Sequence, residues 1–134
     1  SDAQSSLLQD NLRRAALEMA IACEVAVKQA LFAKATPAGA AYEYLEEKHK
    51  VEASVIDLIH VVAKRAFGRS FKDEKASHYK NIDFLFRCRN KVAHRGELIY
   101  RDDSGMHIVN KDIMAVWWES VLILLEWVKV NAPE

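Results

Sequence analysis

Apolar side chains recur every three or four residues through most of this chain, which is the spacing of amphipathic helices. Breaks in the repeat, several of them at Gly or Pro, divide the chain into helical segments. These segments cover residues 6–35, 36–48, 54–67, 73 or 74 to 95, and 111–130. We therefore expect an all-α fold, an up-and-down helical bundle of about four to five helices.

The first of these helices is apolar on two sides. One stripe consists of Leu8, Leu12, Ala15, Met19, Cys23, Ala26 and Ala30, and a second consists of Leu17, Ile21, Val25 and Phe32. Two stripes indicate burial on more than one side of the helix. The second would be covered either by another copy of the chain in a homodimer or by helices of the same copy, and the pattern favours neither.

The spacing of apolar residues changes after Gly96 from helical to nearly alternating. Residues 98–100 and 106–109 are rich in apolar side chains and flank a charged turn that ends in Gly105. This arrangement is typical of a β-hairpin. Because a lone hairpin is marginally stable, we expect it to lean on the bundle just before the last helix.

Length and composition fit a single globular domain. The 134 residues suffice for one core, with residues 1–5 as a linker or a cloning remnant, and 51% hydrophobic with 28% charged residues is ordinary. Cys23 and Cys88 lie in apolar helical context, which favours free buried thiols and a reducing, cytoplasmic location. We see no leader and no run of about 18 apolar residues, so we expect no membrane contact.

The charges of the chain bear on its partners. The 19 basic and 19 acidic side chains cancel, so only a local basic patch could attract RNA. His, Cys and carboxylate residues show no spacing typical of zinc sites, and no Gly-rich phosphate loop exists, so we expect no metal or other cofactor. A basic patch does lie near the end of the fourth predicted helix, with Arg87, Arg89, Lys91, His94 and Arg95.

Arg89 is the unusual residue of this patch. On a helical wheel it lies in the centre of an apolar stripe made of Ile82, Leu85, Phe86, Val92 and Ala93. A buried guanidinium needs a carboxylate, a phosphate or a polar cavity at an interface. In a purely structural interpretation, Arg89 pairs with Glu18 or Glu24 of the first helix. His94 is then only a favourable cation at a helix C-terminus.

A functional interpretation requires Arg89 and His94 to meet at one substrate. Asn90 and His94 are four residues apart and share a face of the helix, which Arg87 also joins. Arg89 and His94, however, are about 140° apart on an ideal helix. They can act together only if the helix end unwinds near Gly96 or if a second copy of the chain supplies one of them.

The segment Arg89-Asn90-Lys91-Val92-Ala93-His94 resembles the R-x(4–6)-H motif of HEPN domains (higher eukaryotes and prokaryotes nucleotide-binding), in which a polar residue, often Asn, follows the Arg. The resemblance extends to the long first helix around residues 17–28. The order of the predicted helices also agrees with that family over most of the chain. It implies an all-α bundle that usually dimerises. Many members of that family are metal-independent endoribonucleases, while others have no catalytic activity.

The resemblance also implies roles for the residues of the basic patch. The catalytic residues would be Arg89, Asn90 and His94, and the RNA-binding residues would be Arg87, Lys91 and Arg95. His94 would transfer protons near neutral pH, and Arg89 would hold phosphate oxygens with its planar fork. The site would combine both protomers of a homodimer, and the product would carry a 2′,3′-cyclic phosphate.

Two other functions are consistent with the sequence. A non-catalytic HEPN-like module would dimerise or bind a protein partner, such as an antitoxin, within a larger assembly of the defence or toxin–antitoxin type. A plain helical interaction domain would have no nucleotide role at all. The sequence alone leaves all three functions open.

Overall fold

The computed structural model describes residues 2–32, 37–49 and 53–132. The order of elements is α1 (Asp2–Leu31), α2 (Pro37–His49), α3 (Val55–Asp57), a π-helical turn η1 (Leu58–Val62), α4 (Ala63–Phe67), α5 (Phe71–Glu74), α6 (Ala76–Arg95), β1 (Ile99–Asp102), β2 (Gly105–Ile108) and α7 (Lys111–Asn131). The expected all-α bundle with a small hairpin before the last helix is confirmed. Among the described helices, none is long and apolar enough to cross a membrane.

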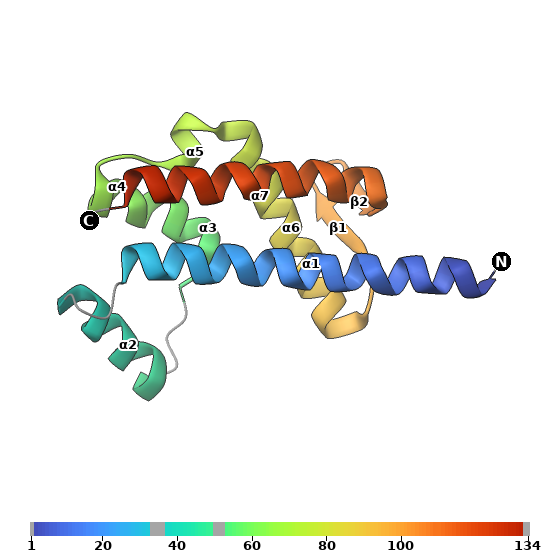
Figure 1. Cartoon of the computed structure of the whole chain (residues 1–134), viewed down its shortest axis with the longest axis horizontal. Coiled ribbons are helices and arrows are strands. Elements are labelled where there is room, and N and C mark those ends of the chain that lie inside the picture. Colours follow the sequence, from blue (N-terminus) through green and yellow to red (C-terminus); the bar gives the residue numbers. More distant parts are fainter. Residues whose placement is uncertain (1, 33–36, 50–52, 133–134) are drawn as a thin grey trace.

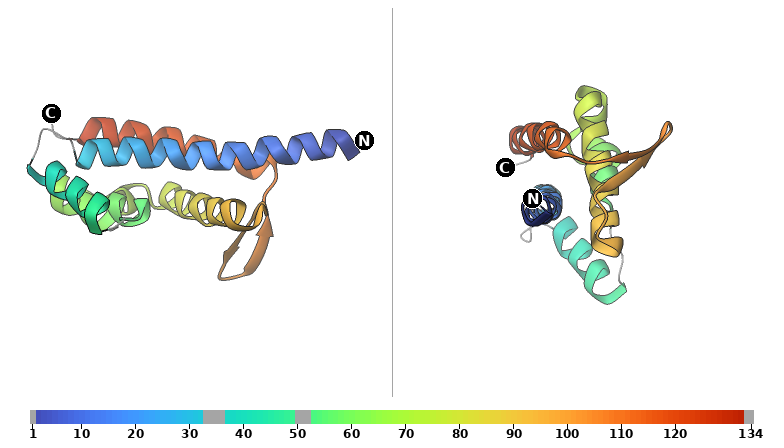
Figure 2. Two further views of the ribbon diagram at one scale, coloured as in Figure 1. Left: turned by 90° about the horizontal axis from the view of Figure 1, so that it is seen from below. Right: turned by 90° about the vertical axis from the view of Figure 1, so that its right-hand side faces the viewer.

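The helices form two layers. α1 and α7 lie side by side in one layer and run in the same direction, while α3, α4, α5 and α6 make up the other (Figure 1, Figure 2). α6 crosses behind both long helices and contacts each of them. Its C-terminal end therefore emerges beside α1, at the edge of the molecule away from α7 (Figure 1).

The core fills the space between the two layers. α7 contributes Trp117, Val121 and Leu124, which are almost completely buried. The second layer contributes Phe71 and Ile82, which are also completely buried. Burial of apolar side chains from both layers is the main force that holds α6 across α1 and α7.

Helix α1 begins earlier than expected. Residues 2–5, expected to belong to a linker or a cloning remnant, are helical, and neither Gly nor Pro interrupts the helix that begins at Asp2. These first turns project beyond the rest of the bundle (Figure 1). The helix ends at Leu31, and residues 33–35 of the expected helix lie outside the described residues.

The two apolar stripes of α1 have different surroundings. The first is buried in the bundle at Leu12, Met19 and Cys23. In the second, Ile21 is 54% exposed and Val25 is 48% exposed. The described helices of the same copy therefore do not cover the centre of the second stripe, which leaves it available to a partner.

The segment expected as one helix over residues 54–67 contains an irregular turn. Ser54 caps its start, since the Ser54 hydroxyl accepts a hydrogen bond at 3.2 Å from the backbone amide three residues later. The π turn η1 inserts an extra residue into the helix. In this turn, His60 Nδ1 lies 2.7 Å from the hydroxyl of Ser70. Gly68, with φ of 77°, ends the segment as its position in the sequence predicts.

The fourth predicted helix is divided at Lys75, which leaves the helical conformation with φ of −133°. α6 therefore begins at Ala76, slightly later than expected. The short α5 before the break starts at Phe71, whose side chain is completely buried. Its ring packs edge-on against Trp127 of α7, with 5.5 Å between ring centroids. The buried ring of Phe71 thus holds the segment before the break against the core, immediately before α6 begins.

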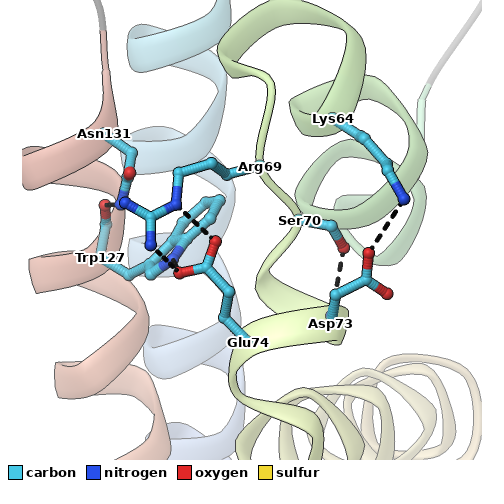
Figure 3. Close-up of polar contacts among 7 residues, drawn as sticks. All are labelled: Lys64, Arg69, Ser70, Asp73, Glu74, Trp127 and Asn131. Carbon is cyan, nitrogen blue, oxygen red and sulfur yellow. Dashed lines mark hydrogen bonds and ion pairs between the residues drawn. The ribbon is translucent and has the colours of Figure 1, made fainter.

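Glu74 ties this break to the end of α7 (Figure 3). Arg69 donates hydrogen bonds from Nε and Nη2 to the two carboxylate oxygens of Glu74, at 2.7 and 2.8 Å. Trp127 Nε1 donates to the same carboxylate at 3.2 Å. The bond to Arg69, more than the one to Trp127, lowers the pKa of Glu74. These contacts fix the point from which α6 starts.

The hairpin leans on α6 as expected. β1 and β2 pair antiparallel, with Ile99 opposite Ile108. Tyr100 of β1 stacks between Phe84 of α6 and His107 of β2, with 4.7 and 5.0 Å between ring centroids. The hairpin therefore shares an aromatic contact with the helix that carries the basic patch.

Asp102 holds the turn of the hairpin together. Its Oδ1 accepts hydrogen bonds from the amide and the hydroxyl of Ser104, at 2.8 and 2.7 Å, and lies 2.8 Å from His107 Nε2. The bonds to Ser104, followed by the bond to His107, lower the pKa of Asp102 from 3.8 to about 2. Because the folded pKa is the lower one, the carboxylate stabilises the hairpin above about pH 4, and this stabilisation is lost as the pH falls through 2.

We expect the hairpin to loosen between about pH 4 and pH 2. NMR contacts between the rings of Tyr100 and His107 should weaken over this range in the wild-type protein. In Asp102→Asn they should already be weak at neutral pH and change little on acidification. Asp103→Asn, at the exposed neighbouring position, is the control and should behave like wild type. Ring contacts in Asp102→Asn as strong as in wild type would contradict this role of Asp102.

Candidate functional site

α6 turns a different stripe toward the core than the pattern indicates. Its buried residues are Ile82, Leu85, Cys88 and Val92, so Cys88 and not Arg89 belongs to the buried stripe. Ala93 is exposed and Phe86 is only partly buried. A small thiol is stable in full burial, whereas a guanidinium there would need a partner. The helix is accordingly rotated, and Arg89 lies at the edge of the buried stripe.

A polar groove of about 450 Å³ opens at this edge. It is bounded by α1, by residues 53–56 at the start of α3, and by α6. Its polar lining residues, which define what we call the motif groove, are Glu24, Ser54, Asp83, Arg87, Arg89 and Asn90. The fold therefore brings Arg87, Arg89 and Asn90 of the basic patch together in one place.

Arg89 is partly buried in the motif groove, where its Nη1 donates a hydrogen bond to Asn90 Oδ1 at 3.3 Å. Within the described part of the chain, no carboxylate lies at ion-pair distance from its guanidinium. Glu24 instead accepts from Lys28 Nζ at 3.1 Å, and Glu18 lines a different groove on the other flank of α1. The structural interpretation of Arg89 as the partner of Glu18 or Glu24 is therefore wrong.

Arg87 is already engaged within the chain. Its Nη2 donates to Asp83 Oδ2 at 3.0 Å, and its Nη1 donates to the carbonyl oxygen of Arg101 at 2.8 Å. The bond to Arg101 connects α6 to β1, and the bond to Asp83 lies within α6. Arg87 thus forms part of the wall of the motif groove as a cross-link between elements, and a contact with RNA would compete with these bonds.

His94, Lys91 and Arg95 do not line the motif groove. His94 and Arg95 are exposed, and Lys91 is partly buried. Arg95 makes only a loose ion pair, with 3.9 Å between its Nη1 and Glu97 Oε1. Because α6 stays helical through Arg95, its end does not unwind to carry His94 toward Arg89. Of the two ways in which Arg89 and His94 could meet, only a second copy remains.

The end of α6 is fixed by Arg13 of α1, a residue outside the motif. Its Nε donates to the carbonyl oxygen of Gly96 at 2.8 Å, and its Nη1 pairs with Asp10 at 2.8 Å. Gly96 itself has φ of 67° and closes the last turn by donating to the carbonyl oxygen of Val92 at 2.9 Å. The spacing of Asp10 and Arg13 indicates a local pair, but the contact with Gly96 joins segments far apart in the sequence. The helix turn that carries His94 is thereby held in place.

The two cysteines are not candidates for chemistry. Both are free and buried, as expected. Burial raises the pKa of Cys23 to about 12 and that of Cys88 to about 11, so both remain protonated and unreactive at neutral pH. Across the described ranges, no three His, Cys, Asp or Glu side chains gather closely enough to hold a metal ion.

The motif groove is chemically suited to a phosphate group. Arg89 offers a planar fork of donors, and the adjacent Asn90 amide offers further hydrogen bonds. The carboxylates in the lining are paired with cations, Glu24 with Lys28 and Asp83 with Arg87, so they do not neutralise Arg89.

Comparisons of the chain with protein-family models, with curated proteins and with solved structures found no match.

Proposed function

We propose that this chain is a HEPN-like RNA-acting domain, a metal-independent endoribonuclease whose catalytic site is completed by a second copy. The observation that carries the proposal is the Arg89 guanidinium, which is partly buried beside Asn90 without a carboxylate partner among the described residues. A partly buried charge is stabilised by an opposite charge. An RNA phosphate would supply that charge and accept two hydrogen bonds from the planar fork of Arg89.

The second copy is proposed to supply His94. On one helix the side chains of Arg89 and His94 point about 140° apart, so they do not reach the same phosphate from one copy. Leu17, Ile21 and Glu24 follow one another at helical spacing on one face of α1, and Glu24 lines the motif groove. A partner that covers the exposed Ile21 would therefore lie beside this groove. His94 of that partner would then act on RNA held by Arg89.

The proposed reaction uses the 2′-hydroxyl of RNA as the nucleophile. The imidazole of His94 takes the proton of this hydroxyl as its oxygen attacks the phosphorus. The bond from phosphorus to the 5′-oxygen breaks. The 5′-oxygen takes a proton from water, and the proton held by His94 is released to water, so no net proton is gained or lost. Arg89 stabilises the charge that develops on the phosphate oxygens, and Asn90 helps to position them. The products are a 2′,3′-cyclic phosphate and a 5′-hydroxyl.

Arg89→Ala is expected to abolish RNA cleavage and to change the free energy of unfolding by no more than about 1 kcal/mol. Cleavage is lost because the other guanidinium of the motif groove, that of Arg87, is already bonded to Asp83 and to the carbonyl oxygen of Arg101. Stability is kept because no buried carboxylate is left without a partner. Cleavage of a labelled RNA and urea unfolding followed by circular dichroism measure the two effects.

Two variants serve as controls for Arg89→Ala. Arg65→Ala removes an exposed arginine of α4 that does not line the motif groove, and it should retain wild-type cleavage. Arg89→Lys keeps the charge without the fork, so RNA binding should persist better than cleavage. A loss of about 3 kcal/mol in Arg89→Ala would reveal a buried ion pair and contradict the proposal.

The second candidate is a non-catalytic HEPN-like module, which is favoured by the position of His94 outside the motif groove. In that form the basic patch would bind RNA without cleaving it, and the affinity for RNA would fall steeply with salt concentration. Alternatively, the patch would bind a protein partner such as an antitoxin. We propose a defence or toxin–antitoxin system as the setting of either form, as the resemblance implies. The free cysteines fit a cytoplasmic location for both forms.

A further inference from the structure

The side of α1 that faces away from the bundle carries a stripe of exposed side chains along most of its length. Leu7 is 62% exposed, and Ile21 and Val25 are each about half exposed. Arg14 and Glu18 are exposed as well and lie between Leu7 and Ile21. On an ideal helix these five side chains fall within about 60° of one another. We call them the outer stripe of α1.

The two charges of the outer stripe are not paired within the described part of the chain. There, no carboxylate makes an ion pair with Arg14, and no cation makes one with Glu18. The two residues are four apart, but an Arg that precedes a Glu is the less favourable order for a pair along a helix. An exposed apolar stripe with one charge of each sign near its middle therefore suits a partner that carries the complementary pattern.

We infer that the outer stripe is the contact between the two copies of the proposed homodimer, in which the two α1 helices run antiparallel about a two-fold axis. An axis level with Ala16 places Arg14 of each copy opposite Glu18 of the other, so both charges are satisfied in both copies. Leu7 and Val25 are also centred on position 16, and the same register therefore places them opposite each other. The outer stripe is thus complementary to itself.

The length of α1 favours the same register. α1 runs from Asp2 to Leu31, so its midpoint lies between positions 16 and 17. An antiparallel pair centred there overlaps over almost the whole helix, a length of about 43 Å. A register shifted by a turn or more would shorten this overlap and would no longer place Arg14 opposite Glu18. The charges and the helix length therefore select one arrangement.

The projecting start of α1 fits this contact. Its first turns extend past the beginning of α7, and the exposed Leu7 belongs to them (Figure 2). In the antiparallel pair, these turns lie along the last turns of the other copy's α1, where Val25 is exposed. Ile21 of that copy comes between the levels of Leu7 and Arg14. A helix without the projecting turns would leave both apolar side chains of the other copy in water.

The contact also bears on the nuclease site, in a step that rests on the proposed function. A two-fold axis perpendicular to the plane of the two helices keeps the flank of α1 that faces α6 on the same side in both copies, so the two motif grooves open side by side. Arg13 marks the end of α6, to which it is bonded. Arg13 of one copy comes level with Met19 of the other, about 8 Å along the helix from Glu24 of the motif groove. His94 of one copy is thus brought toward Arg89 of the other.

Charge reversal tests the contact. Arg14→Glu and Glu18→Arg each place like charges opposite one another twice, so each alone is expected to halve the particle mass measured by light scattering. An equal mixture of the two variants should return to the dimer mass, because every opposed pair is then of opposite sign. The double variant, in which one chain carries both substitutions, should be dimeric for the same reason. Arg65→Glu on α4 and Glu47→Arg on α2, both at exposed positions, are the controls and should keep the wild-type mass.

Introduced cysteines test the direction of the helices. Leu7→Cys and Val25→Cys are expected to form a disulfide between copies when the two variants are mixed and oxidised, and neither should do so alone. In a dimer of either variant alone, the two introduced thiols lie about 27 Å apart along the helix, which no disulfide spans. Cys23 and Cys88 are buried and do not compete. Cross-linking of either variant alone would indicate a parallel pair and overturn the inference.

These measurements separate the contact from the nuclease. A dimeric double variant together with the mixed cross-link, but without RNA cleavage, would support the contact and count against the nuclease. Cleavage at wild-type mass in both Arg14→Glu and Glu18→Arg would overturn the contact and leave the nuclease with a different interface. A monomeric wild-type protein, or a mixture of the cysteine variants that does not cross-link, would overturn the contact as well.

Discussion

His94→Ala is expected to slow RNA cleavage by about 10²- to 10⁴-fold while the protein remains folded. The imidazole is the proposed general base, and no other described histidine belongs to the basic patch. The side chain is exposed near the end of α6, so its removal opens no cavity in the core. Initial rates on a labelled RNA and the melting temperature measure the two parts of this expectation.

His49→Ala is the matched control for this variant, because His49 is an exposed histidine on α2. It should cleave RNA at the wild-type rate. The wild-type rate should survive EDTA, because no metal ion takes part in the proposed reaction. A substrate with a 2′-deoxy sugar at the cleaved position should be inert. Cleavage of that substrate, or full activity in His94→Ala, would contradict the mechanism.

Phe71→Ala is expected to lower the free energy of unfolding by about 3 to 5 kcal/mol. The ring is completely buried and packs edge-on against Trp127. Its loss leaves a cavity beside the break that precedes α6, a site held on both sides by other elements. Since domains of this size are stable by about 5 to 15 kcal/mol, the urea midpoint should fall sharply.

Phe67→Ala provides the comparison for Phe71→Ala. Phe67 also packs near Trp127, with 6.3 Å between ring centroids, but it is only partly buried. Its replacement should cost about 1 kcal/mol, because the site can refill with solvent. Equal losses for the two variants would show that Phe71 is not the anchor of this part of the core.

Most of the fold was predictable because its signals are local. Ser54 and Gly68 bound a helical segment by side-chain capping and by a positive φ, both of which depend on residue type. The change of apolar spacing after Gly96 likewise predicts the hairpin. The break at Lys75 was missed because it depends on Phe71 and Glu74, whose contacts are with α7, far away in the sequence.

The environment of the site was less predictable. A helical wheel treats Phe86 as a better core residue than Cys88, but contacts with two crossing helices bury Cys88 and leave Phe86 at the edge. Because of this rotation, Arg89 lies in the wall of a groove and not at the centre of the core, where the helical wheel predicts it. The contacts of Arg87 with β1 and of Arg13 with Gly96 bring together distant segments, so the motif itself contains no signal for them.

A catalytic site shared between two copies can be tested by mixing two inactive variants. Arg89→Ala and His94→Ala each remove one residue from every site of a homodimer. In a random mixture, half of the dimers contain one of each, and one of their two sites combines an intact Arg89 with an intact His94. The mixture should therefore recover about a quarter of the wild-type cleavage rate. A mixture no more active than the separate variants, under conditions where wild-type copies exchange, would contradict a shared site.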